Sequence, residues 1–562
     1  MTGKLHWASL GLFVLLGHVG LLMYSAAWHS PTTDEPAHLA AGLSMWRTGS
    51  FSDYSVNPPL VRMVASFPVL FMEHGTDNTS RAPGAFARSE FSVGNDFVRM
   101  NGERTLWLLT VARWACIPFS LLGAWTCRVW ARDVFGPPAG FVALCLWCLS
   151  PMILGHGAVI TADVPCAAMF VTTCYAFYIW LSLPTWGAAF TVGILLGTAL
   201  LTKFTCLLAI PVMVFVWLVS IYPCFRVACM AKNVWQSQTS GEQGNRCKAA
   251  SGFKHSPGSG VRRQLLQLTV TFLTAIAVVN IGYGFEGSGR RLDSYQFRSR
   301  LFTGVPHRTG PLIIDDPATV AASRFGNRFC GSVLGALHIP LPENYLGGID
   351  IQRRDFETPV RSYLFGEWKN GGWWYYYLAG FLVKLPIGTL LLIALASFCF
   401  LRTGVRAGAV VELLIGVPLV IVMATCSAQT NMSHHLRYAM PVLPFLFIWI
   451  SRSVCDWCVQ AQCLRVFACT AVVGMSMASL FVFPHSLAFF NVFAGGPNNG
   501  QMFLLDSNFD WGQNRIYLRE WMEDHPEARP MSFESPLGYD HQLIGLKCIK
   551  APHSPTPGWH AI

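Results

Sequence analysis

The segment Trp28-His29-Ser30-Pro31-Thr32-Thr33-Asp34-Glu35-Pro36-Ala37-His38 organises the rest of this 562-residue chain. It follows an apolar run, residues 6–28, that has the length of one membrane span. Its two adjacent acids, Asp34 and Glu35, therefore lie where a helix leaves the lipid. Because charge near hydrocarbon is costly, we expect the pair to face a cation, a metal ion or a reacting group. A helix N-cap followed by Pro36 in the first turn is the structural alternative.

Composition indicates a chain that crosses a lipid bilayer several times. Hydrophobic residues make up 52% of it and charged residues only 12%, against about 25% charged residues in soluble domains. The net charge of +10 does not indicate a nucleic-acid partner. Seven basic residues and one acid, Glu242, occupy the polar segment 225–263 between two apolar runs. The positive-inside rule places such a loop in the cytoplasm, where we expect a disordered connector.

Eleven apolar runs are candidate spans of an all-α polytopic membrane protein. Threading them with the amino terminus inside leaves loops 29–105 and 285–373 and the tail 484–562 outside. We therefore predict a membrane domain over residues 1–483, with outer juxtamembrane helices, and a small mixed outer cap over residues 484–562. The candidate spans are residues 6–28, 106–127, 138–157, 165–183, 186–202, 204–222, 265–284, 374–400, 409–426, 438–451 and 466–483.

A second acid occupies a position like that of the first pair. Asp163 follows one span and precedes Pro165, which opens the next helix, so it lies at an outer junction of two spans. Acids at two outer junctions could converge on one cavity. There they could activate a hydroxyl as a general base or hold a divalent cation through oxygen ligands.

Four cationic side chains are candidates for the other half of a site. Lys203 ends the fifth span, where a snorkelling interfacial lysine is the alternative. Arg437 precedes a span and follows two histidines, a placement that favours contact with an anionic ligand such as phosphate. Arg62 could face lipid headgroups or a substrate equally well. Arg113 lies inside the second span and should pair with an acid or line the cavity.

The two histidines before Arg437 are His434 and His435. Adjacent histidines on a helix point in different directions, which argues against a two-histidine metal site. Acids and cations together on the outer face suit one reaction well. A sugar on a lipid phosphate is displaced at its anomeric carbon by an acceptor hydroxyl, a carboxylate takes the proton, and cations hold the departing phosphate.

Short motifs spread over most of the chain resemble those of the GT-C glycosyltransferases, in the superfamily of protein O-mannosyltransferases and aminoarabinose transferases. Two further stretches are similar to a prokaryotic branch of it. The motifs are Asp34-Glu35, Asn57-Pro58-Pro59-Leu60, Thr161-Ala162-Asp163, Leu200-Leu201-Thr202-Lys203, His435-Leu436-Arg437-Tyr438 and, for the prokaryotic branch, Tyr363-Leu364-Phe365-Gly366-Glu367 and Asp506-Ser507-Asn508-Phe509-Asp510-Trp511-Gly512-Gln513.

The resemblance implies a GT-C type bundle, a polyprenyl-phosphate sugar donor and inversion at the anomeric carbon. It assigns the acceptor proton to Asp34, with Glu35 and Asp163 in support, and the phosphate to Lys203 and Arg437. The remaining predicted substrate contacts are His435, Arg62, Asn57, Arg113 and Trp511.

The resemblance also implies a setting for the reaction. It indicates a bacterial inner membrane with the site on the periplasmic face. The acceptor is a protein, a lipid or a glycan. The resemblance implies no required metal ion, although the acids could still bind a divalent cation. Two departures bear on specificity: Asn57 stands where some lipid-A-modifying relatives have lysine, and loop 285–373 shows no repeat like the extra lumenal domain of eukaryotic mannosyltransferases.

Several alternatives stay open from sequence alone. Trp511 could stack on a sugar. The alternative, which we favour, is a structural turn held by the side chains of Asp and Asn residues. Cys330 and Cys548 both fall outside and could form a bridge. A transporter of lipid-linked sugars would also need charged groups in its spans, and an inactive binding protein would keep the same motifs.

Overall fold

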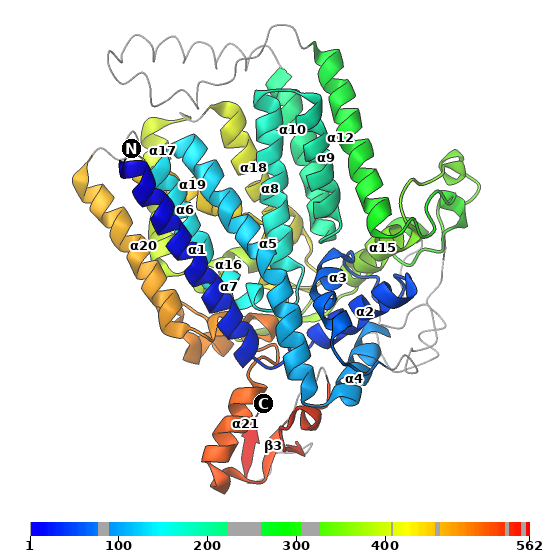
Figure 1. The fold of residues 1–562 in the computed structure, drawn as a ribbon, viewed down its shortest axis with the longest axis vertical. Coiled ribbons are helices and arrows are strands. Elements are labelled where there is room, and N and C mark those ends of the chain that lie inside the picture. Colours follow the sequence, from blue (N-terminus) through cyan, green and yellow to red (C-terminus); the bar gives the residue numbers. More distant parts are fainter. Residues whose placement is uncertain are drawn as a thin grey trace.

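The computed structural model describes residues 2–76, 89–221, 260–304, 326–405, 408–455, 461–533, 539–551 and 558–561. Most of the predicted inside connector, residues 225–259, lies outside this described part. The helices of the bundle stand side by side, and the amino terminus lies at the end opposite to the carboxyl terminus (Figure 1). In the described part, seven helical segments are long and apolar enough to cross a membrane. They are α1 (Thr2–Trp28), α5 (Arg104–Phe135), α8 (Asp163–Ser182), Phe204–Ile221 with α10 (Ala209–Ile221), α12 (Val261–Gly282), α18 (Ala409–Ala428) and α20 (Gln462–Val482).

Four of the eleven predicted spans differ from single straight crossings. Two are helix pairs bent by 53° and 114°. A proline stands at the start of each second helix, as the first residue of one and as the N-cap of the other, and proline cannot continue the hydrogen bonding of the preceding helix. Two others are shorter apolar helices, and at 1.5 Å per residue a 15-residue helix reaches only about 22 Å of a hydrocarbon core about 30 Å thick. The bent pairs are α6 (Pro137–Cys148) with α7 (Pro151–Gly157) and α16 (Tyr376–Lys384) with α17 (Ile387–Thr403), and the short helices are α9 (Trp186–Leu200) and α19 (Val442–Ile450).

Three short helices cover one end of the bundle, as predicted for the juxtamembrane helices of the first outer loop. They are α2 (Glu35–Thr48), α3 (Leu60–Ser66) and α4 (Ser89–Asn101), which lie together beside the lower end of α5 (Figure 1). A Cβ on Gly94 would come within 2.6 Å of the Ala37 backbone nitrogen, so glycine there lets α4 cross close to the start of α2. Buried Leu39, Leu43 and Phe97 form the core between these helices.

The rest of the same end is mixed in structure. A short helix α13 (Arg300–Thr303) and α15 (Glu343–Glu357) precede an antiparallel hairpin of β1 (Arg361–Leu364) and β2 (Glu367–Asn370). The tail contributes α21 (Arg515–Asp524) and a three-stranded sheet in which β3 (Met531–Phe533) pairs in parallel with β4 (Ile549–Lys550) and β5 (Trp559–Ala561). An all-α membrane protein with small sheets at one end is therefore confirmed.

The two outer cysteines are not bridged. Cys330 is exposed and Cys548 is buried, and both are free thiols. The Cys548 thiol lies 3.6 Å from the sulfur of Met522, inside the small apolar core of the tail. Burial in that core separates it from the exposed cysteine.

Candidate active site

Arg437 brings together segments that are far apart in the chain. It lies in a short 3-10 helix, Leu436–Ala439, and its side chain is only 10% exposed. One guanidinium nitrogen lies 3.4 Å from an oxygen of Asp34, and the other lies 3.9 Å from an oxygen of Asp163. The guanidinium also stacks 3.7 Å above the ring of Trp511. Four residues predicted from sequence therefore meet at one point.

Lys203 extends this cluster on the side of Asp163. Its ammonium nitrogen lies 2.5 Å from the Asp163 carboxylate, and both side chains are buried. The same ammonium lies 4.8 Å from the ring centre of Tyr438, so it does not snorkel to the interface. Asp163 thus faces two cations, Lys203 and Arg437. The four charged groups alternate in sign, which lets a buried polar network persist.

Asp34 is the more accessible acid of the cluster. Its side chain is 21% exposed, against 5% for Asp163. Asp34 occupies the N-cap position of α2, but its side chain makes no capping hydrogen bond, so the purely structural interpretation does not account for it. A group that approaches from outside can reach this carboxylate, whereas Asp163 is enclosed by its cations.

Glu35 has a different environment from its neighbour. It is fully buried, and its carboxylate accepts hydrogen bonds from Arg113 and from the backbone N–H groups of Thr32 and Ile160. Burial acts to raise the pKa of Glu35, but Arg113 and the hydrogen bonds outweigh it and the pKa lies below its ordinary value. No surface is left for a substrate. The structure thus shows Glu35 in a structural pairing that ties the loop before Asp163 to α2, and its support of Asp34 stays a prediction.

Arg113 and Arg62, two of the predicted substrate contacts, are both held by internal contacts in the structure. All five N–H donors of Arg113 are used, by Glu35 and by the carbonyls of Ala26, His29 and Ser30. The expected pairing with an acid is confirmed. Arg62 is 1% exposed and donates to the carbonyls of residues 54, 56 and 57 while it stacks on Tyr54. It faces neither lipid headgroups nor an open cavity.

Asn57 shapes the turn that Arg62 holds. Its φ is +66°, a left-handed conformation that asparagine tolerates better than most residues. Its buried side-chain oxygen has no hydrogen-bond partner among the described residues. The turn leads into α3, whose first residue, Leu60, donates its N–H to the carbonyl of Leu201, two residues before Lys203. Asn57 is therefore anchored close to the site, with one polar atom unused.

The tail motif, residues 506–513, packs against the site. The carbonyl of Trp511 accepts the N–H of Thr33, and its own N–H donates to the side chain of Gln513. The Trp511 ring is 6% exposed and is covered by Arg437. These contacts agree with the structural-turn interpretation, and the ring packs against the Arg437 guanidinium. Sugar stacking stays a prediction.

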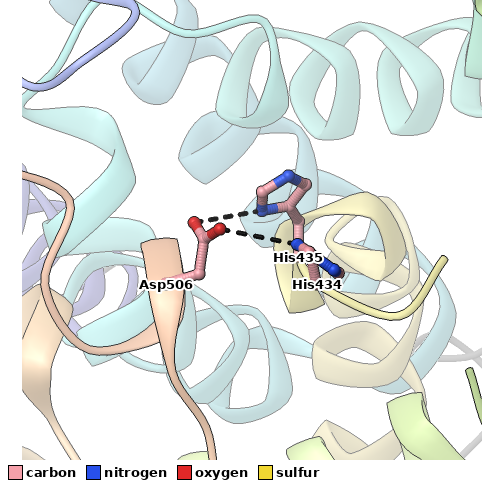
Figure 2. Close-up of side chains that lie close together, drawn as sticks. All are labelled: His434, His435 and Asp506. Carbon is pink, nitrogen blue, oxygen red and sulfur yellow. Dashed lines mark ion pairs between the residues drawn. The ribbon is translucent and has the colours of Figure 1, made fainter. Parts of the chain in front are cut away.

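His434 and His435 lie on extended backbone before the short 3-10 helix, not within a helix. Both rings approach the carboxylate of Asp506, each with 3.6 Å between its Nδ1 and a carboxylate oxygen (Figure 2). The expectation that the two rings diverge is therefore wrong, because it assumed helical geometry. Asp506 belongs to the tail motif, and no sequence pattern singles it out as a site residue.

Two more buried histidines near the cluster were missed. His38 interacts electrostatically with Arg437 and Asp163, and so does His156. For His38 the sequence held a signal, since it follows Asp34 by four residues on one helix and the two positions share a face. For His156 no sequence pattern distinguishes it from a core histidine.

Buried histidines at this end of the molecule predict loss of stability in acid. Burial, with the charge of Arg113, lowers the pKa of His29 to about 4, and burial with Arg62 lowers the pKa of His38 well below 6.5. Between pH 6.5 and 4 the unfolded chain binds protons that the folded chain does not, so stability is complete above pH 6.5 and declines as the pH falls. Melting temperatures at pH 7, 6 and 5 should show this decline. His29→Asn should flatten it, whereas the exposed control His525→Asn should not. Equal slopes in all three proteins would contradict the assignment.

Comparison with known families agrees with the class that the fold and site define, an integral-membrane protein with a charged site at one end of a helical bundle. Residues 108–231 match the family model described as dolichyl-phosphate-mannose-protein mannosyltransferase. This segment spans the second to sixth predicted spans and contains Asp163 and Lys203. The match confirms the resemblance to protein O-mannosyltransferases over that segment. No curated protein matches the chain by sequence.

Solved structures with a similar course of the chain have low sequence identity. ArnT from Cupriavidus metallidurans in the apo state is 13% identical, with a TM-score of 0.44, over 98% of this chain and 86% of that one. The same protein bound to undecaprenyl phosphate gives 11% identity and a TM-score of 0.43 over the same shares. The apo oligosaccharyltransferase of Archaeoglobus fulgidus gives 12% identity and a TM-score of 0.40, over 97% of this chain and 61% of that one.

Proposed function

We propose that this protein is an integral-membrane glycosyltransferase that moves a sugar from a polyprenyl-phosphate donor to an acceptor hydroxyl. The family match over residues 108–231 supports the class of reaction and of donor. The observation that carries the proposal is the position of Asp34, a partly exposed carboxylate 3.4 Å from a buried arginine. A base beside a cation is what displacement of a phosphate by a hydroxyl requires. We place the site on the outer face of a bacterial inner membrane.

The reaction needs only groups that this chain supplies. The acceptor oxygen attacks the anomeric carbon while its proton passes to Asp34. A new carbon–oxygen bond forms as the bond from that carbon to the phosphate oxygen breaks. The polyprenyl phosphate departs with the electron pair and is held by Arg437 and Lys203. A single displacement from the opposite side inverts the configuration at the anomeric carbon.

Arg437 has an unused donor for this purpose. Its buried Nε–H has no hydrogen-bond partner among the described residues, and an unsatisfied buried donor costs about 1–3 kcal/mol. A phosphate oxygen would satisfy it. The planar guanidinium also suits phosphate better than an ammonium does, because it can donate two parallel hydrogen bonds.

The test uses the purified full-length protein and a radiolabelled polyprenyl-phosphate hexose. Wild type should release polyprenyl phosphate and transfer label to an added hydroxyl acceptor. Arg437→Lys should raise the KM for the donor by about 10-fold or more, because it loses the fork of donors. The matched control is Arg132→Lys. Arg132 is half-exposed and lies in the last turn of α5, so this variant should behave as wild type.

Two outcomes would contradict the proposal. Tight donor binding without release of polyprenyl phosphate from any hexose donor would favour a transporter of lipid-linked sugars or an inactive binding protein. An unchanged KM and rate of release in Arg437→Lys would show that this arginine does not bind the donor phosphate. Transport itself would be measured as movement of labelled donor across the membrane of vesicles that contain the protein.

A further inference from the structure

The cluster of His434, His435 and Asp506 has the spacing of a metal site. One nitrogen of each ring and one carboxylate oxygen all lie within 4.8 Å of one another (Figure 2). The two distances from ring Nδ1 to carboxylate oxygen are both 3.6 Å, which is too long for a hydrogen bond. Ligands bound tetrahedrally to zinc at about 2.0–2.1 Å stand roughly 3.3 Å apart. Each ring faces a different oxygen of the carboxylate, so the three groups surround one point at separations somewhat longer than those of bound ligands.

The tautomer of His434 fits metal binding. Its Nε2 lies 2.5 Å from the backbone carbonyl oxygen of Arg361 in β1. A carbonyl only accepts hydrogen bonds, so Nε2 carries a proton, and in the neutral ring Nδ1 then has the lone pair that faces Asp506. Histidines that bind metals usually donate their other N–H to a carbonyl or carboxylate in this way.

The two segments that carry the cluster are held together by Asn508. Its side-chain oxygen accepts the N–H of Leu436, 2.9 Å away, and its side-chain nitrogen donates to the carbonyl of His434, 2.6 Å away. It also donates to the hydroxyl of Tyr376. The backbone on both sides of His435 is thereby fixed against the turn that begins at Asp506, so little reorganisation is needed to bring the three ligands onto one ion.

We propose that His434, His435 and Asp506 bind a divalent transition-metal ion, with Zn²⁺ as the preferred ion. Two imidazoles and one carboxylate suit zinc, whereas calcium and magnesium prefer oxygen ligands alone. The Ser507 hydroxyl lies 2.8 Å from His435 Nδ1, and metal binding exchanges that hydrogen bond for a coordinate bond. The carboxylate is 36% exposed, which leaves a way in for the ion and a fourth position for a further ligand.

The proposal does not depend on glycosyl transfer. It has a consequence for the proposed function, because the charge of Asp506 interacts with Arg437. An ion at the cluster would add positive charge on the side of the site that we assign to the donor phosphate. Metal binding is measured apart from activity, so failure of one proposal leaves the other open to its own test.

The experiment titrates Co²⁺ and then Zn²⁺ into the full-length protein after chelator treatment. Wild type should develop visible cobalt absorption that saturates at one ion per chain and disappears when Zn²⁺ displaces the cobalt. His434→Ala and Asp506→Asn should each weaken Zn²⁺ binding by at least about 10-fold. Ser507→Ala should bind at least as tightly as wild type, because it removes the competing hydrogen bond without removing a ligand.

Controls separate a lost ligand from a lost fold. His525→Ala removes an exposed histidine of the tail and should keep wild-type metal binding. Zn²⁺ should raise the melting temperature of wild type and of Ser507→Ala but not of Asp506→Asn. Wild type without a saturable cobalt spectrum, or with a spectrum that Asp506→Asn and His434→Ala reproduce in full, overturns the proposal. If Asp506→Asn does not fold, His434→Gln and Ser507→Ala still decide it.

Discussion

Asp34→Asn is expected to lower the rate of sugar transfer by about 10²- to 10⁴-fold, which is what a positioned general base contributes. The amide has the size of the carboxylate but cannot take up the acceptor proton. Arg437 loses its partner at 3.4 Å but keeps Asp163 at 3.9 Å, so the guanidinium should stay near the donor phosphate. The loss should therefore appear in kcat, with the KM for the donor close to that of wild type.

Single-turnover release of labelled polyprenyl phosphate is the appropriate measurement, because it reports the chemical step without product dissociation. Asp510→Asn, an exposed acid in the same tail motif as Trp511, is the matched control and should match wild type. If Asp34→Asn keeps the wild-type rate, the base lies elsewhere in the cluster, and Asp163 becomes the next residue to replace.

The second large effect concerns stability. Glu35→Gln should destabilise the protein by about 3–5 kcal/mol, the usual result of removing one partner from a buried ion pair. At 1% exposure the Arg113 guanidinium cannot turn to solvent for a substitute of the lost carboxylate. Glutamine keeps the shape of the side chain but cannot offset the charge of Arg113. An NH₂ group, which is a donor, also replaces one of the two carboxylate oxygens and faces the donors of Arg113.

Thermal melting of the detergent-solubilised protein, read from tryptophan fluorescence, measures this loss. Glu73→Gln, which breaks the exposed pair with Arg104, is the control and should change the melting temperature little. Asp34→Asn should also stay close to wild type, which would separate the functions of two adjacent acids. A melting temperature unchanged in Glu35→Gln would mean that Arg113 has another counter-charge.

Local patterns sufficed for the membrane bundle and for much of the site. Each predicted span coincides with a helix or a bent helix pair, because length and hydropathy are properties of a short run of sequence. The acids and cations at the ends of these runs also had to lie at one end of the bundle, once the runs were threaded in order. That Asp34, Asp163, Lys203 and Arg437 meet was foreseeable for this reason.

The functions of individual charged residues were not foreseeable in the same way. Asp34 and Glu35 are neighbours with similar chemistry, yet one reaches Arg437 and the other turns into the protein toward Arg113. Arg62 resembled an interfacial cation in the sequence and proved to hold a turn. Long-range packing makes these distinctions, because a side chain's partners come from segments that no local pattern relates to it.

The sequence by itself determined which runs form apolar helices and which end of the bundle carries charge, because hydrophobic length and the cost of buried charge act on each segment separately. Which of those runs are long and straight enough to cross a membrane was decided by the structure. Only the tertiary structure decided which charges pair, which histidines share a carboxylate and which acid stays within reach of a substrate. Those outcomes depend on distances of a few ångströms between segments as far apart as Asp34 and Arg437, and electrostatic and hydrogen-bonding energies change steeply over such distances.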